Sequence, residues 1–104
     1  MKYLKLSKRL ETIAGYVEKN SAVADIGTDH GYIPVYLAQN NIARRIVATD
    51  IREGPLARAK LSSLEYGVGD RIEFRLTGGL EGLQGQGLDT IIIAGMGGET
   101  IAGI

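Results

Sequence analysis

The chain has 104 residues, of which twelve are basic and twelve acidic, with one histidine and no cysteine. This length suits one small domain with a modest core, and the balanced charge argues against a protein that wraps nucleic acid by bulk charge, while leaving a local basic patch open. Without cysteine there is no disulfide framework and no thiolate metal site, and a lone histidine builds no metal cluster, so we expect no metal.

No apolar run approaches the roughly 20 residues that cross a bilayer, and the N-terminal residues lack the apolar core of a signal peptide. We therefore expect a cytoplasmic protein with no membrane partner. The last residues, 97–104, begin an apolar segment after a predicted strand and stop without a cap or polar tail. We interpret residues 1–104 as the N-terminal part of a longer domain.

The first predicted element is a helix that begins after Ser7, whose hydroxyl can cap it. The apolar residues Leu10, Ile13, Ala14 and Val17 recur at the spacing that places them on one face of a helix. We expect this face to lie against a sheet.

A buried strand at 22–26 runs directly into an acidic, glycine-bracketed turn, DIGTDHG. Glycines let the backbone approach a ligand, and a carboxylate at the carboxyl end of a strand can bind ribose hydroxyls or a cationic amine. Asp25 and Asp29 would repel a pyrophosphate, and the spacing Gly27-x-x-x-Gly31 departs from the G-x-G-x-x-G of dinucleotide sites. The turn therefore favours a nucleotide-like cofactor without phosphate.

A second helix is predicted with Pro34 in its first turn, ending near residue 40. The next predicted strand, 45–49, is followed by Asp50, which lies 25 residues beyond Asp25. In a right-handed βαβ unit this spacing returns the chain to the neighbouring parallel strand. Asp50 is thus expected at the same edge of the sheet as the glycine turn.

The remaining pattern predicts a third helix over 54–66 and a strand over 71–76 at the edge of the same sheet. Residues 78–87 include five glycines, which predicts a mobile loop because each interior glycine costs a helix roughly 1 kcal/mol. The continuous β-branched run at 89–94 is typical of a strand covered on both faces.

Five strings of the chain together resemble one family. They are LSKRL at 6–10, ADIGTDHGYIP at 24–34, ATDI at 48–51, GPLARAK at 54–60 and IAGMGGETIA at 93–102. The chain resembles, over essentially its whole length, the TrmK family of bacterial tRNA (adenine-N1)-methyltransferases. This resemblance implies S-adenosylmethionine as the cofactor and N1 of adenine 22 in tRNA as the methylated atom.

The resemblance also implies an α/β fold of the Rossmann-like class I methyltransferase type, a parallel sheet with flanking helices. The family has seven strands followed by a helical C-terminal portion, so the chain is expected to stop after about four strands, in the order 3-2-1-4. Strand four would then form an open edge through which a dimer could assemble.

Carried over residue by residue, the family's cofactor site takes four groups of residues at the carboxyl ends of the strands. They are Asp25, Gly27, Thr28, Asp29 and Gly31; Asp50 and Ile51; Gly78, Gly79 and Leu80; and Ala94, Gly95 and Met96. The resemblance places Asp50 on the ribose hydroxyls. Related enzymes commonly carry an aspartate after strand three, whereas this chain has glycine there, which leaves recognition of the cofactor's adenine to the backbone.

Methyl transfer from a sulfonium to a ring nitrogen is an in-line displacement that needs alignment rather than a covalent nucleophile. Methylation makes the adenine cationic, so a nearby carboxylate would stabilise the developing charge. Asp29 and Glu99 are the candidate catalytic residues. His30 is either a proton acceptor or a hydrogen-bonded structural residue of the turn.

Basic residues gather near the N-terminus, where Lys5, Lys8 and Arg9 follow Lys2. They predict phosphate contacts with tRNA, although a solvated helix face explains them equally well. Tyr32 is the tyrosine within the turn motif and is a candidate for stacking on a flipped adenine.

Two other functions remain open from the sequence. One is a nicotinamide dinucleotide-binding domain with an unusual glycine turn, which would also place Asp50 on a ribose. The other is a non-catalytic Rossmann-like fragment that binds a partner through its open sheet edge.

Overall fold

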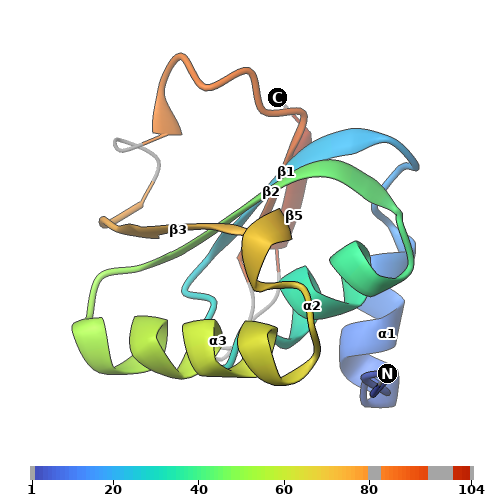
Figure 1. The fold of residues 1–104 in the computed structure, drawn as a ribbon. Coiled ribbons are helices and arrows are strands. Elements are labelled where there is room, and N and C mark those ends of the chain that lie inside the picture. Colours follow the sequence, from blue (N-terminus) through green and yellow to red (C-terminus); the bar gives the residue numbers. More distant parts are fainter. Residues whose placement is uncertain (1, 80–82, 94–99, 104) are drawn as a thin grey trace.

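The protein folds around a single sheet that is covered by three helices on one face (Figure 1). The structure is a computed structural model that describes residues 2–79, 83–93 and 100–103, the last of these for the backbone only. The elements are α1 (Lys8–Gly15), β1 (Ser21–Ile26), α2 (Tyr32–Gln39), β2 (Ala43–Asp50), α3 (Glu53–Glu65), the 3₁₀ turn η1 (Gly69–Arg71), β3 (Glu73–Leu76), β4 (Thr90–Ile93) and β5 (Thr100–Gly103).

Within the described residues the strand order is β3-β2-β1-β4-β5. The first four strands are parallel to one another, which confirms the predicted order 3-2-1-4 and the Rossmann-like class of the fold. The predicted open edge at strand four is wrong, because β5 pairs with β4 in antiparallel register. The expected dimer therefore loses the edge on which it was based, since backbone groups of β4 are already bonded on both sides.

The sheet divides the apolar residues into two clusters because successive side chains of a strand point to opposite faces. Val23, Val35 and Leu37 belong to the larger cluster, on the face covered by the helices. Ala22, Ala24 and Ile91 point to the other face, where Leu83 and Leu88 of the loop before β4 pack on them. The β-branched run of β4 contributes to both clusters, as a strand covered on both faces should.

The predicted helix caps and stops are confirmed where the sequence carries a local signal. Ser7 caps α1, its hydroxyl accepting a hydrogen bond from the Leu10 amide at 3.3 Å. Asn40 caps the end of α2, and Gly67 follows α3 with φ of +76°. β2 is longer than predicted, at 43–50, because it pairs with a strand on each side.

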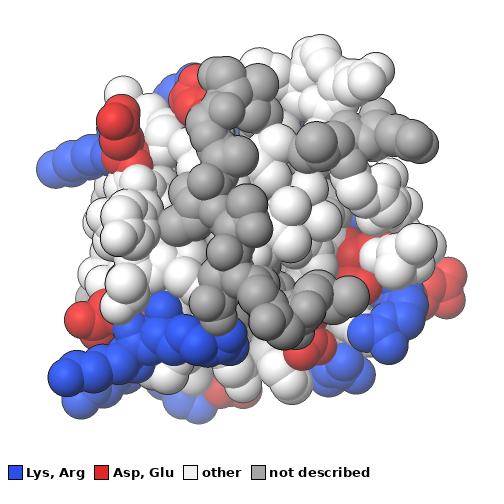
Figure 2. All heavy atoms as spheres, turned by 180° about the vertical axis from the view of Figure 1, so that it is seen from behind, with Lys and Arg blue, Asp and Glu red and all other residues white. Residues whose placement is uncertain are grey.

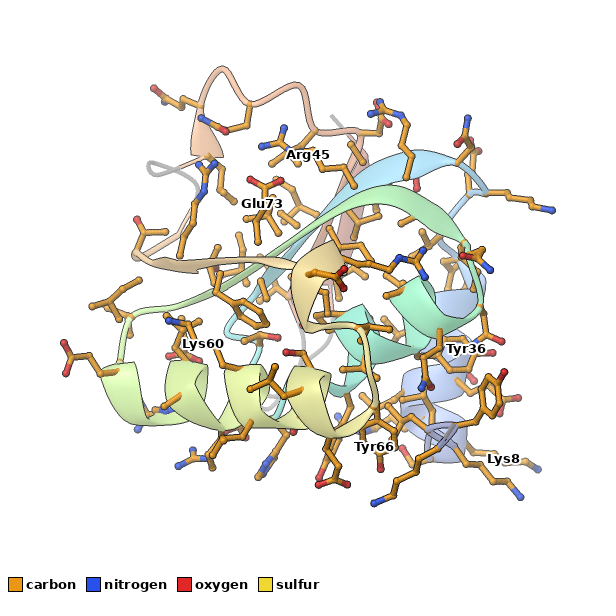
Figure 3. The ribbon with its side chains drawn as sticks, viewed as in Figure 1. Lys8, Tyr36, Arg45, Lys60, Tyr66 and Glu73 are labelled. Carbon is orange, nitrogen blue, oxygen red and sulfur yellow. The ribbon has the colours of Figure 1, made fainter. Side chains whose placement is uncertain are left out.

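Side-chain contacts at the amino ends of the strands tie the edge strand β3 and the glycine-rich loop to the sheet (Figure 3). Arg45 of β2 points toward Glu73 of β3, and its Nε lies 2.7 Å from Glu73 Oε2. This pairing lowers the pKa of the Glu73 carboxyl. Arg45 also donates to the main-chain carbonyl of Gln86. These bonds hold the loop at the end of the sheet opposite to the predicted site.

Charged side chains lie mainly around the rim of the molecule seen from behind (Figure 2). Lys and Arg gather at the lower left of that view, which corresponds to the lower right of Figure 1, where α1 and the N-terminal segment lie. No helix in the described part of the chain is long and apolar enough to cross a membrane.

The glycine turn packs closely against α3 at Gly31, so a larger residue at this position should destabilise the fold. The φ of Gly31 is +73°, and a Cβ built on it would lie 2.9 Å from Ala59 Cβ. Gly31→Ala should lower the free energy of unfolding by ~2–4 kcal/mol, from left-handed strain and overpacking together. Gly15→Ala is the control, because no atom lies within 4 Å of its added Cβ and its φ is not positive. Urea unfolding that shows equal effects for the two variants would contradict this packing.

Candidate functional site

The acidic turn that follows β1 is held by its own backbone amides. The Thr28 amide donates to the Thr49 carbonyl of β2 at 2.9 Å, and the Gly31 amide donates to the Thr28 carbonyl at 3.0 Å. Gly27 and Asp29 both have positive φ, +70° and +54°. The turn therefore coils tightly between β1 and α2, and the amides of Thr28 and Gly31 point to protein oxygens.

Asp50 joins this turn to the end of β2, as the sequence predicted. The residue is only 5% exposed. One carboxylate oxygen accepts from the Asp29 amide at 3.4 Å, and the other accepts from the Arg52 amide at 3.1 Å. These two bonds fix the orientation of the carboxylate. Because each carboxylate oxygen has a second acceptor position, both can still accept hydrogen bonds from ligand hydroxyls.

Asp25, the first residue of the motif, is buried beneath the turn with 4% of its surface exposed. The Thr28 hydroxyl donates to its Oδ2 at 2.8 Å. The pKa of the Asp25 carboxyl is raised to about 7, mainly by burial; the Thr28 hydrogen bond opposes this change, and the nearby Asp50 charge adds to it. Asp25 is therefore partly protonated at neutral pH.

Two hollows flank the turn and share Gly27 and Asp29 as their common wall. The first has a volume of about 210 Å³ and reaches down to Asp25, with Arg9 on its wall. The second has a volume of about 420 Å³ and is lined by Asp50. A Cβ at Gly27 would meet no atom within 4 Å, so this backbone borders open space on the side where a ligand can approach closely.

The structure brings most of the predicted cofactor residues together around these two hollows. Ile51, Gly78 and Gly79 line the second hollow with Asp50, and Thr28 lines the first. Gly31 lies behind the turn against α3 and touches neither hollow. The predicted residues Leu80, Ala94, Gly95, Met96 and Glu99 lie outside the described residues.

Asp29, a candidate catalytic carboxylate, is paired rather than isolated. Arg58 of α3 lies 2.9 Å from its Oδ1, and His30 Nε2 lies 3.8 Å from its Oδ2. The sequence did not single out Arg58, because its link to the turn depends on how α3 packs beside Gly31. His30 also stacks on Tyr32, with ring centroids 5.1 Å apart and an interplanar angle of 13°.

The three predicted RNA-binding residues occupy different surroundings. Lys8 is exposed at the start of α1. Lys5 lines a separate hollow beside α1. Arg9 instead lines the first hollow next to the acidic turn. The sequence pattern could not predict that Arg9 lies in a different place from the two lysines, because all three are exposed polar residues of one short segment.

Several lining residues were missed by the sequence. Leu10 and Ile33 line the first hollow, and Thr77 and Ile93 line the second. Their apolar or common polar side chains carry no motif signal, and only the folded arrangement places them there. In the described part of the chain no group of three or more His, Cys, Asp or Glu residues is placed to hold a metal ion.

Comparison with known proteins places these features in a family. A model of the methyltransferase domain matches residues 6–104. The chain is 43% identical over 104 residues to the tRNA (adenine(22)-N(1))-methyltransferase of Bacillus subtilis (strain 168), and the match covers all of this chain but 44% of that protein.

Two solved structures have the same arrangement. The crystal structure of the TrmK tRNA methyltransferase of B. subtilis matches with a TM-score of 0.82 and 42% identity, covering 90% of this chain and 40% of that one. The structure of M. capricolum TrmK in complex with S-adenosyl-homocysteine matches with a TM-score of 0.79 and 38% identity, covering 86% and 41%. The chain thus spans less than half the length of the relatives that it matches.

The buried Asp25 carboxyl predicts how stability depends on pH. Its folded-state pKa of about 7 lies above the ordinary value of 3.8, so its contribution is full below about pH 4, falls as pH rises to about 7, and is then constant. Asp25→Asn should remove this slope and gain up to ~4 kcal/mol relative to the parent between pH 4 and pH 8. Asp70→Asn, at an exposed aspartate of η1, serves as the control. Urea unfolding curves of Asp25→Asn that run parallel to the parent's at every pH would refute the burial argument.

Proposed function

Because the chain belongs to the methyltransferase domain family, we propose that the protein carrying it methylates N1 of an adenine in tRNA with S-adenosylmethionine as the methyl donor. The observation that carries the proposal is the pair of hollows on either side of Gly27, with the Asp50 carboxylate in one and Arg9 in the other. The substrate class is supported by the similarity to the adenine-22 N1 methyltransferase of B. subtilis. Since the chain spans 44% of that relative, the activity is proposed for the whole protein.

The second hollow suits the nucleoside end of this cofactor. Its volume of about 420 Å³ lies in the range of small-molecule sites, which is roughly 300–1,000 Å³. Asp50 would accept hydrogen bonds from the two ribose hydroxyls, because both of its oxygens are already oriented by backbone amides. Ile51 and Ile93 provide apolar walls for the adenine ring, and the backbone at Gly79 is accessible for its polar edge.

The first hollow suits the amino-acid end. The Arg9 guanidinium on its wall is the natural partner of an α-carboxylate, since it can donate two parallel hydrogen bonds. Asp25 and Asp29 on the same wall provide acceptors for the α-ammonium group. This proposed role for Arg9 differs from the two that the sequence left open, a phosphate contact with tRNA and a solvated helix face.

The amides of the turn argue against the dinucleotide alternative. Dinucleotide sites bind pyrophosphate through free backbone N–H groups of the glycine loop and the following helix N-terminus. Here the amides of Thr28, Asp29 and Gly31 already donate to protein oxygens. A pyrophosphate would have to displace the Asp50 carboxylate from the Asp29 amide, whereas a phosphate-free cofactor leaves these bonds intact.

The proposed residues act by binding and orientation. S-adenosylmethionine, when bound, supplies a methyl group on a positively charged sulfur. Asp50 and Arg9 would hold the two ends of this ligand, and the bare backbone of Gly27 would allow close approach between them. Asp29 is the described carboxylate proposed to stabilise the positive charge that develops on adenine, and its pairing with Arg58 fixes its position. A tRNA-modifying role also implies a cytoplasmic location.

Methyl transfer measured on the complete protein tests the function. Incubation with labelled S-adenosylmethionine and unmodified tRNA should give N1-methyladenine at one site, which stops reverse transcription there. Asp50→Ala should raise KM for the cofactor by roughly 10- to 100-fold, because the variant loses the hydrogen bonds that the ribose hydroxyls donate to a charged acceptor. Asp70→Ala, at the exposed aspartate of η1, should match the parent. Absence of methyl transfer to tRNA, or an unchanged KM in Asp50→Ala, would refute the proposal.

Two ligands of different length test the role of Arg9. S-adenosylhomocysteine carries the amino-acid end, and methylthioadenosine lacks it. Arg9→Ala should weaken binding of the first by ~10-fold or more and leave the second unchanged, because only the first offers a carboxylate to the guanidinium. Asp50→Ala should weaken both ligands alike. Calorimetry that finds equal losses for both ligands in Arg9→Ala would exclude a contact with the carboxylate.

A further inference from the structure

A third hollow, not used by the cofactor arrangement, adjoins the first one. It has a volume of about 300 Å³ and lies between the N-terminal segment and the residue that follows α3, Tyr66. Leu10 and Tyr32 line both this hollow and the first one. A chain-like ligand whose reacting part lies near the first hollow can therefore continue past Tyr32 into the third.

The side-chain amide of Gln39, at the end of α2, holds the walls of this third hollow in place. Its Oε1 accepts from the Leu4 amide at 2.8 Å. Its Nε2 donates to the Lys2 carbonyl at 2.6 Å and to the Tyr66 carbonyl at 3.0 Å. The segment before α1 is thus tied to the end of α3, which makes the hollow a preformed feature of the fold.

The chemistry of the third hollow is aromatic and basic. Tyr32 and Tyr66 contribute aromatic rings and Lys5 a positive charge, and none of its described lining residues is acidic. The nearby Glu65 is paired with Lys2 at 2.5 Å. A larger hollow beside the start of β1 differs, because it is lined by Glu18 and Asp89 as well as Lys19.

The N-terminal segment around the third hollow is also basic. Residues 2–10 contain four basic side chains and no acidic one. Figure 2 shows the resulting accumulation of Lys and Arg at the α1 corner, and Figure 3 shows Tyr66 at the end of α3 that faces this corner. Aromatic rings that stack bases, combined with cations that contact phosphates, are the features by which proteins bind unpaired nucleotides.

We propose that the third hollow binds the unpaired RNA nucleotide next to the adenine that is methylated. Its base stacks on the Tyr66 ring beside the Lys2 ammonium, which lies 5.2 Å from the centroid of that ring. Its phosphate lies against Lys5, and Tyr32 separates it from the methylation site. This inference rests on the proposed function and adds to it a substrate-positioning surface. Stacking is tolerant of base identity, so the surface selects an unstacked strand rather than a sequence.

Matched substitutions in the complete protein test this surface. Tyr66→Leu and Lys5→Ala should each weaken tRNA binding by ~10-fold, while Tyr66→Phe, which keeps the ring, should bind as the parent does. Lys5→Ala should also reduce the salt dependence of binding by roughly one phosphate contact. The controls are Tyr16→Leu and Lys19→Ala, exposed residues beside the hollow that carries acidic side chains. All five variants should bind S-adenosylhomocysteine normally.

Ultraviolet crosslinking to tRNA independently identifies the part of the protein that contacts the RNA. Trypsin releases residues 61–71 as one peptide in which Tyr66 is the aromatic residue. This peptide should carry the RNA adduct in the parent and lose it in Tyr66→Leu. Normal methyl transfer with no adduct on this peptide, or unchanged tRNA affinity in Tyr66→Leu, would overturn the proposed surface while leaving the function standing. Absence of any methyl transfer to tRNA would overturn the function itself.

Discussion

The hydrogen bond from the Asp29 amide to the Asp50 carboxylate is the contact on which the arrangement of the site depends. It joins the turn after β1 to the end of β2, and the Thr28 amide reinforces it by donating to Thr49. Together these bonds hold the turn against the carboxyl end of β2. The amides of Thr28, Asp29 and Gly31 therefore donate to protein oxygens, and the groups that we propose to bind the ligand are side-chain carboxylates and the guanidinium of Arg9.

Asp25 and Asp50 are two buried carboxylates close together, and this arrangement is electrostatically unfavourable when both are charged. The effect appears at Asp25. Its raised pKa allows a proton to neutralise one of the pair near neutral pH, while Asp50 is held by two backbone amides. Arg58 compensates the third carboxylate of the turn, Asp29. The site therefore distributes its negative charge unequally, with a hydrogen-bonded acceptor at Asp50 and a buried, partly protonated acid at Asp25.

Much of the architecture could be predicted because it depends on local signals. The Ser7 cap, the glycine stop after α3 and the β-branched run of β4 each act within a few residues, and the βαβ spacing was sufficient to bring Asp50 to the turn. The β4–β5 pairing was missed because antiparallel pairing of a short segment leaves no periodic signal. Arg58 and Gln39 were missed for another reason: their partners are 29 and as many as 37 residues away in sequence, so only tertiary packing reveals their roles.

We propose that the acidic turn accepts a phosphate-free cofactor and excludes a dinucleotide. Calorimetric titration of the protein with S-adenosylhomocysteine and, separately, with NAD distinguishes the two kinds of site. We expect saturable binding of S-adenosylhomocysteine and no detectable binding of NAD, because the amides of Thr28, Asp29 and Gly31 already donate to protein oxygens. Binding of NAD with comparable affinity would contradict it.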